Sequence, residues 1–212
     1  MKALISTRED AGQQLAKRLL HLRGHDVVVL ALPRGGVPVA AEIAKALNAP
    51  LDLLFVRKIG APHESELAYG AVVDGDPPQV VINDEVALMD PMNASDLAQA
   101  TNDEIAEIGR RRQVYRQNRA ALDVAGREVV VVDDGLATGT TAKAALKGLR
   151  MQHPSRLILA VPVAPRDTLA ELRTWVDEIV CLATPEPFSS IGQHYADFHQ
   201  LEDDEVLALM HR

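Results

Sequence analysis

The sequence predicts an α/β protein with a doubly wound, mainly parallel sheet of about five core strands and a C-terminal hood segment. Apolar runs of strand length alternate with segments of helical periodicity, the order that right-handed crossovers between parallel strands require. The runs are continuous, as in strands buried on both faces. Aromatic residues make up only 3% of the composition, so Val, Leu, Ala and Ile must build the core. The 212 residues are expected to form one domain.

The first elements are a helix, a strand, a glycine turn, a second helix and a second strand. Ser6 and Thr7 stand three residues before Glu9 and Asp10, a capping-box spacing, and apolar residues then repeat with helical period to about Leu22. The elements after this helix are a strand at 27–32, a turn at 33–36, a helix at 37–47 and a strand at 51–56.

The middle of the chain, about 60–125, is expected to leave the sheet as a flexible loop and a helical excursion. Residues 60–76 are rich in glycine and charge, and we interpret them as mobile. A short strand is predicted at 80–82, and an exposed, charged helix from Ser95 to about Leu122. Arginines gather near its end at positions 110, 111, 112, 116 and 119.

The alternation of strands and helices resumes after this excursion. Its elements are a strand at 128–132, a loop at 133–139, a helix at 140–150, a strand at 157–163, a helix at 166–175 and a strand at 178–182. The tail, residues 183–212, is expected to form the hood and holds Phe188, Tyr195 and Phe198. These three rings are candidates to stack on a nucleobase, and core packing is the open alternative.

Composition excludes several classes of function. A net charge of −8 and a pI near 5.3 argue against a sequence-independent grip on nucleic acid. No run approaches the roughly 18 apolar residues of a membrane span. The single cysteine, Cys181, rules out an internal disulfide and favours a reducing compartment, so we expect a cytoplasmic protein.

The run from Val129 to Thr141 carries the chemistry. Asp133 and Asp134 follow four valines, so they stand at the carboxyl end of a buried strand, where open α/β sheets bind ligands. The residues after them offer backbone amides and three hydroxyls as the chain enters a helix, which suits a phosphate. The carboxylates suit ligand hydroxyls or hydrated Mg²⁺ instead.

This run resembles the thirteen-residue signature of the type I phosphoribosyltransferases, and the similarity extends over nearly the whole chain. The alternative is a strand–turn–helix that uses glycine only for its turn. The resemblance assigns Asp133 and Asp134 to the ribose hydroxyls of 5-phosphoribosyl 1-pyrophosphate. It assigns the 5-phosphate to Ala137, Thr138, Gly139, Thr140 and Thr141.

The turn after the first strand resembles the family's pyrophosphate loop. In it the amides of Gly35 and Gly36 face the leaving group, and Arg34 adds a charge-assisted contact. Arg57 and Lys58, expected to end the next strand at the same edge, are further candidates, with a solvated strand end as the alternative. The family closes a flexible loop over its reaction centre, for which residues 60–76 and the stretch from Arg110 to Arg119 are candidates. A solvated helix end is the default interpretation of those arginines.

The resemblance implies an Mg²⁺-dependent transfer of the 5-phosphoribosyl group from phosphoribosyl pyrophosphate to a nitrogenous acceptor. It also implies a homodimer and a reaction without a protein nucleophile. No residue is assigned as a direct protein ligand of the metal. Two features depart from relatives that act on purines: Ala137 replaces an acidic residue, and residues 161–165 hold no lysine. The alternative is therefore a regulatory protein that binds phosphoribosyl pyrophosphate or a nucleotide without turnover. His194, Asp197 and His199 lie close together in the sequence and could suggest a separate metal site. They lack the usual spacing of a ligand pair and an assigned third ligand, so we do not expect a metal there.

Overall fold

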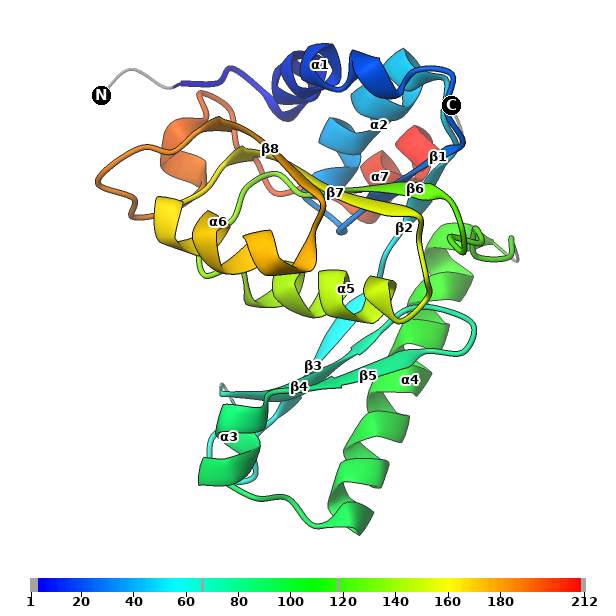
Figure 1. Ribbon diagram of the computed structural model, residues 1–212, viewed down its shortest axis with the longest axis vertical. Helices are drawn as coiled ribbons and strands as arrows, with labels where there is room; N and C mark the ends of the chain where they lie inside the picture. The colour runs from blue at the N-terminus through cyan, green and yellow to red at the C-terminus, as the bar shows by residue number, and fades with distance from the viewer. Residues whose placement is uncertain (1–3, 66, 118, 211–212) are drawn as a thin grey trace.

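The computed structural model describes residues 4–65, 67–117 and 119–210 and shows an α/β fold around a five-stranded parallel sheet (Figure 1). The strand order is β2-β1-β6-β7-β8, and every neighbouring pair is parallel. The bounds are β1 Val27–Ala31, β2 Leu51–Leu53, β6 Glu128–Val132, β7 Arg156–Val163 and β8 Glu178–Ala183. The predicted parallel sheet is confirmed.

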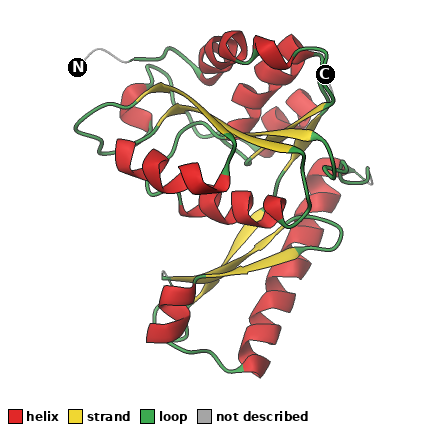
Figure 2. Cartoon of the chain, in the orientation of Figure 1, coloured by secondary structure: helices red, strands yellow, loops and turns green. Residues whose placement is uncertain are grey.

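Helices cover both faces of this sheet (Figure 2). One face packs against α1 (Arg8–Arg18), α2 (Gly36–Leu47) and α7 (Asp203–Met210), and the other against α5 (Thr140–Arg150) and α6 (Arg166–Leu172). Three single 3₁₀ turns are η1 (Leu20–Leu22), η2 (Arg173–Trp175) and η3 (Gly192–His194). The predicted cap of the first helix is confirmed, since Thr7 Oγ1 accepts a hydrogen bond from Asp10 N. No helix in the described residues is long and apolar enough to cross a membrane.

A second sheet, which the sequence analysis did not predict, fills the middle of the chain. It is antiparallel, in the order β3-β4-β5, and lies beside α5, with α3 and the long α4 on its other side (Figure 1). The bounds are β3 Val56–Gly60, β4 Ala68–Val73, β5 Gln79–Ile82, α3 Asp84–Met89 and α4 Ala94–Arg116. The predicted helix from Ser95 thus ends earlier than expected, and the short strand predicted at 80–82 is confirmed.

Two expectations about this region need correction. The strand predicted at 51–56 is two strands in different sheets, because the chain leaves the main sheet after Leu53. Residues 60–76, interpreted as a mobile excursion, contain β4, which is mostly buried. Gly148 of α5 explains the close packing there, because a Cβ at that position would lie 2.6 Å from Val73 Cβ. Mobility within 60–76 stays a prediction.

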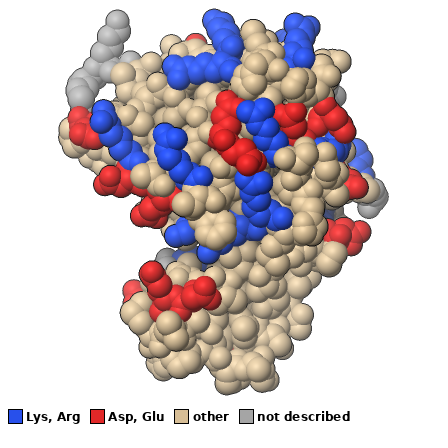
Figure 3. All heavy atoms as spheres, viewed as in Figure 1, with Lys and Arg blue, Asp and Glu red and all other residues tan. Residues whose placement is uncertain are grey.

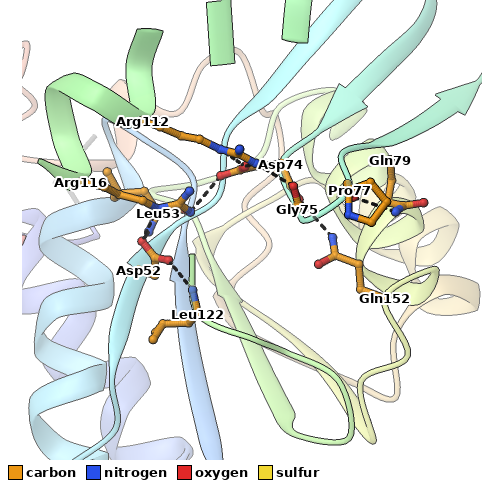
Figure 4. Close-up of polar contacts among 10 residues, drawn as sticks. All are labelled: Asp52, Leu53, Asp74, Gly75, Pro77, Gln79, Arg112, Arg116, Leu122 and Gln152. Atoms are coloured by element: carbon orange, nitrogen blue, oxygen red, sulfur yellow. Dashed lines mark hydrogen bonds and ion pairs between the residues drawn. The ribbon is translucent and has the colours of Figure 1, made fainter. Parts of the chain in front are cut away.

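A buried cluster of charges joins the two sheets at the end of α4 (Figure 4). Arg116 Nε donates to Asp52 Oδ1 at 2.8 Å and its Nη2 to the carbonyl of Leu53 at 2.6 Å, while Nη2 also lies 2.9 Å from Asp74 Oδ2. Arg112 Nε donates to Asp74 Oδ1 at 2.7 Å. Arg116 is only 4% exposed, so the interpretation of a solvated helix end is wrong for it. Asp52 and Asp74 occupy both arginines, which argues against a contact with a ligand.

Candidate functional site

The acidic pair lies where the sequence placed it, at the carboxyl end of the central strand β6, which is flanked by β1 and β7. Asp134 is buried, with 7% of its surface exposed, and Asp133 is partly buried. The backbone NH of Asp134 donates to Asp133 Oδ1 at 2.9 Å. Two neighbouring carboxylates therefore stand at the site that the topology of a parallel sheet reserves for ligands.

Asp134 is buried and Asp133 partly buried, so both carboxyl groups have lost hydration. Burial raises the pKa of Asp133 well above its usual value, and the neighbouring charge of Asp134 raises it further. Burial also raises the pKa of Asp134, while the hydrogen bond from Arg8 opposes that change. A ligand hydroxyl or a cation that replaces the missing water would stabilise these carboxylates.

Arg8, at the start of α1, is a site residue that the sequence analysis missed. Its Nε donates to Asp134 Oδ2 at 2.8 Å, and both side chains are about nine-tenths buried. One signal was present in the sequence. A cation in the first turn of a helix is disfavoured by the helix dipole by about 1 kcal/mol or less. An arginine directly after the cap at Thr7 is therefore a weak signal of an anionic partner, and Glu9 and Asp10 in the same turn weaken it further.

The predicted phosphate turn leads directly from the acidic pair into α5. Leu136 N donates to the carbonyl of Val163, which fixes the turn to β7, and Thr138 and Thr140 expose hydroxyls 3.2 Å apart. The first amides of α5, from Thr140 onward, have no carbonyl partner within the helix. Amides and hydroxyls in this arrangement suit an anion, as at other helix N-termini.

Gly139 has a different neighbour from the one expected. It precedes α5 with φ +70°, and a Cβ there would lie 2.6 Å from Thr168 Cγ2 of α6. The sequence analysis expected this glycine to keep a Cβ away from the phosphate. Its surroundings instead indicate a packing role against Thr168, whose hydroxyl donates to the carbonyl of Ala137 at 2.8 Å.

Replacing Gly139 by alanine is expected to lower the free energy of unfolding by about 1–2 kcal/mol, because the left-handed backbone is strained by a Cβ. Adding Thr168→Ser removes the methyl group that the new Cβ overlaps and keeps the hydroxyl, so part of this loss should return. Affinity for inorganic phosphate in the folded protein should stay close to that of the wild type. Denaturant unfolding and calorimetry measure the two quantities, with Thr168→Ser alone as control. A loss of affinity that persists after stability recovers would mean that Gly139 also keeps a Cβ away from the phosphate.

The glycine turn after β1 packs directly against the acidic pair. A Cβ on Gly35 would overlap the carboxylate of Asp134, and one on Gly36 would lie 2.5 Å from the carbonyl oxygen of Val132. Both glycines are therefore required for this close approach. Arg34 points toward the C-terminal helix, where its Nη1 lies 3.5 Å from Asp203 Oδ1. The structure brings the turn and the acidic pair together.

Arg57 and Lys58 do not lie where they were expected. They belong to β3 of the second sheet and not to the end of a strand in the main sheet, because the chain changes sheets after β2. They line a cavity of about 700 Å³ together with Thr138, Thr140 and Thr141, while the turn at 34–36 is not among its described lining residues. Arg57 Nε donates to Glu104 at 2.7 Å. Lys and Arg side chains gather where the upper and lower parts of the molecule meet (Figure 3).

The three tail aromatics differ in their availability to a ligand. Tyr195 is buried, its ring contacts that of Phe198, and its hydroxyl donates to the carbonyl of Asp134 at 2.7 Å. Burial raises the pKa of Tyr195. A stacking role for Tyr195 is therefore wrong. The centre of the Phe198 ring lies 3.9 Å from Cζ of Arg8, and the ring of Phe188 packs against that of His194. Stacking by Phe188 or Phe198 stays a prediction.

The donor set around the acidic pair fits a magnesium ion that arrives with its ligand. Among the described residues no group of three or more His, Cys, Asp or Glu side chains is placed to hold a metal. Magnesium in phosphate-transfer sites is bound by one or two carboxylates, with water and substrate phosphate supplying the other ligands. Asp133 and Asp134 would supply such a pair. His199 is engaged otherwise, by Asp197 and Glu205.

Comparisons with known proteins show the family of the chain. The family model described as "Phosphoribosyl transferase domain" matches residues 5–197. The Mycobacterium tuberculosis H37Rv protein named "Putative phosphoribosyl transferase Rv0571c" is 47% identical over 209 residues, which cover 99% of this chain and 47% of that protein. "Bifunctional protein PyrR" of Thermus thermophilus is 48% identical over 62 residues, 29% of this chain and 34% of that protein. The chain thus spans about half the length, or less, of these curated relatives.

A solved structure supports the fold over its full extent. The crystal structure of TT1426 from Thermus thermophilus covers 97% of this chain and 97% of its own, with 37% identity and a TM-score of 0.85. The family match spans the parallel sheet, the acidic pair, the phosphate turn and the glycine turn that packs against the pair. This chain therefore belongs to the phosphoribosyltransferase domain family.

Proposed function

We propose that this protein transfers the 5-phosphoribosyl group of phosphoribosyl pyrophosphate to a nitrogenous acceptor and releases pyrophosphate. One observation carries the proposal: the acidic pair lies between the phosphate turn that enters α5 and the glycine turn that packs on Asp134. A ligand with phosphate at one end, hydroxyls in the middle and pyrophosphate at the other end matches this order of groups.

Each part of the ligand then has its own contacts. The amides and hydroxyls of residues 137–141 bind the 5-phosphate, the acidic pair accepts hydrogen bonds from the ribose hydroxyls, and the amides of Gly35 and Gly36 face the pyrophosphate. Arg34 leaves Asp203 and contacts the leaving group. Breaking this ion pair costs little free energy, because both side chains are exposed. Mg²⁺ bound with the pyrophosphate would neutralise charge that develops on it.

Catalysis by this chain then consists of positioning and of charge stabilisation at the leaving group. The C-terminal tail lies at the carboxyl edge of the sheet, where Ile191 packs on Gly135, so the acceptor is expected beside it. A homodimer and a requirement for Mg²⁺ are part of the same proposal. Arg57 and Lys58 are assigned to anionic groups of the ligand at the cavity that they share with the phosphate turn.

A second candidate function is binding without turnover. It is favoured by Ala137, because no acidic side chain stands there to exchange a proton with a base, as expected of relatives that act on purines. In that case the same site senses phosphoribosyl pyrophosphate or a nucleotide and regulates a partner.

Incubation with phosphoribosyl pyrophosphate, Mg²⁺ and a panel of nucleobases tests both functions. We expect pyrophosphate release that depends on one acceptor and is abolished by EDTA. Ligand at about 100 times its Kd should also stabilise the fold by about 2.7 kcal/mol, visible as a higher melting temperature. Stabilisation without release supports the sensor. An unchanged melting temperature at millimolar ligand contradicts both functions.

A further inference from the structure

The guanidinium of Arg8 is the main link between the N-terminal helix, the C-terminal tail and the acidic pair. Besides Asp134, Arg8 binds the carbonyl oxygen of His199 through Nη1 at 2.9 Å, and its Cζ lies 3.9 Å from the centre of the Phe198 ring. The side chain is 8% exposed. An arginine fork that is held at its Nε, at Nη1 and on its face has little freedom to reorient.

Asp134 is held by three described neighbours, although no described residue hydrogen-bonds to its Oδ1. Arg8 occupies Oδ2, the backbone of Gly35 packs against the carboxylate, and Tyr195 donates to the carbonyl oxygen of the same residue. Asp133 differs from it. Its Oδ1 accepts the NH of Asp134, and no described residue hydrogen-bonds to its Oδ2. The two members of the acidic pair are therefore not equivalent.

We propose that Arg8 is a positioning residue that clamps the carboxylate of Asp134 beside Asp133, so that the acidic pair meets the ribose hydroxyls in one fixed orientation. This inference rests on the proposed function for the identity of the ligand. Arg8 acts through Asp134 and touches no reacting atom. Because Arg8 also binds the tail at His199 and Phe198, the tail and the acidic pair are positioned by one side chain.

Arg8→Gln and Arg8→Lys test the clamp, with Arg18→Gln as a matched control. Arg18 lies on the same helix and donates to the carbonyl of Cys181, but it is exposed and remote from the pair. Arg8→Gln should weaken phosphoribosyl pyrophosphate about 10-fold or more, since a charged hydrogen bond that orients the site is lost. Affinity for inorganic phosphate should stay within about two-fold, and Arg8→Lys should restore part of the loss. Arg18→Gln should change neither affinity. Equal weakening of both ligands, measured in the folded fraction, would overturn the inference.

A double-mutant cycle with Asp134→Asn separates positioning from a general structural role. If Arg8 acts through Asp134, then Arg8→Gln should cost little further affinity once Asp134 is asparagine. Full additivity of the two losses would overturn the inference.

A carboxyl-carbon NMR titration supplies a readout that needs no ligand. The titration midpoint of Asp134, which faces Asp133, Tyr195 and Arg8, should rise in Arg8→Gln and stay in place in Arg18→Gln. An unmoved midpoint would overturn the clamp. A wild-type protein that binds no phosphoribosyl pyrophosphate would contradict the proposed function instead, while the titration still decides the role of Arg8.

Discussion

Replacing Arg116 by methionine is expected to lower the free energy of unfolding by about 3–5 kcal/mol, because it leaves a buried carboxylate without its counter-charge. Asp52 is 5% exposed, and Arg116 provides its ion pair (Figure 4). After the replacement, the donors that remain to it among the described residues are the backbone NH groups of Leu53 and Leu122. Asp74 keeps Arg112 as a partner. The loss is measurable by denaturant unfolding at constant m-value.

Two further variants show that the effect comes from charge. Arg116→Met with Asp52→Asn should be more stable than Arg116→Met alone, because the unpaired charge is gone and an amide oxygen can still accept one NH. Arg110→Met, on the same helix, removes an exposed pair with Glu107 and should change stability by less than about 1 kcal/mol. Equal losses in Arg116→Met and in the double variant would mean that packing of the guanidinium, and not its charge, holds the junction.

The two buried arginines also show what the sequence could and could not reveal. Arg116 stands in the last turn of α4, where a cation is favoured by the helix dipole, so nothing in the local pattern signals burial. Its partners Asp52 and Asp74 lie 64 and 42 positions away, Asp52 in β2 of the main sheet and Asp74 directly after β4 of the second sheet. Arg8 stands in a first turn, where a cation is disfavoured, but Glu9 and Asp10 share that turn, so the local pattern gives only a weak signal of the distant partner Asp134.

The two sheets also differ in whether the local sequence predicts them. Strands of the main sheet are continuous apolar runs such as Val129–Val132, which identify themselves without knowledge of their neighbours. The strand β4 contains Gly70 and two alanines and has weak strand propensity. It forms because β3, β5 and α5 pack around it, which the sequence does not show locally. The acidic pair was located correctly because its position follows from the end of β6 alone.

Replacing Asp133 by asparagine is expected to weaken phosphoribosyl pyrophosphate about 10- to 100-fold. A hydrogen bond to a charged group contributes roughly 1.5–3 kcal/mol, and no described residue hydrogen-bonds to Asp133 Oδ2, which leaves that oxygen for a ribose hydroxyl of the proposed ligand. Affinity for inorganic phosphate should be unchanged or higher, because a negative charge beside an anion site is removed. Calorimetry with each ligand gives both values, and Asp103→Asn, an exposed carboxylate on α4, is the control.

The same variant should be more stable than the wild type at neutral pH, the reverse of its effect on binding. Because burial and Asp134 raise the pKa of Asp133 in the folded state, the fold holds this proton more tightly than the unfolded chain does. The stability that this proton contributes is present at acid pH and is lost as the pH rises through the raised pKa. Asparagine does not ionise, so its advantage should be largest near pH 7.5 and should shrink toward pH 4. An advantage that is independent of pH would mean that Asp133 ionises freely in the folded protein. The carboxyl group whose ionisation the fold opposes would then be that of Asp134.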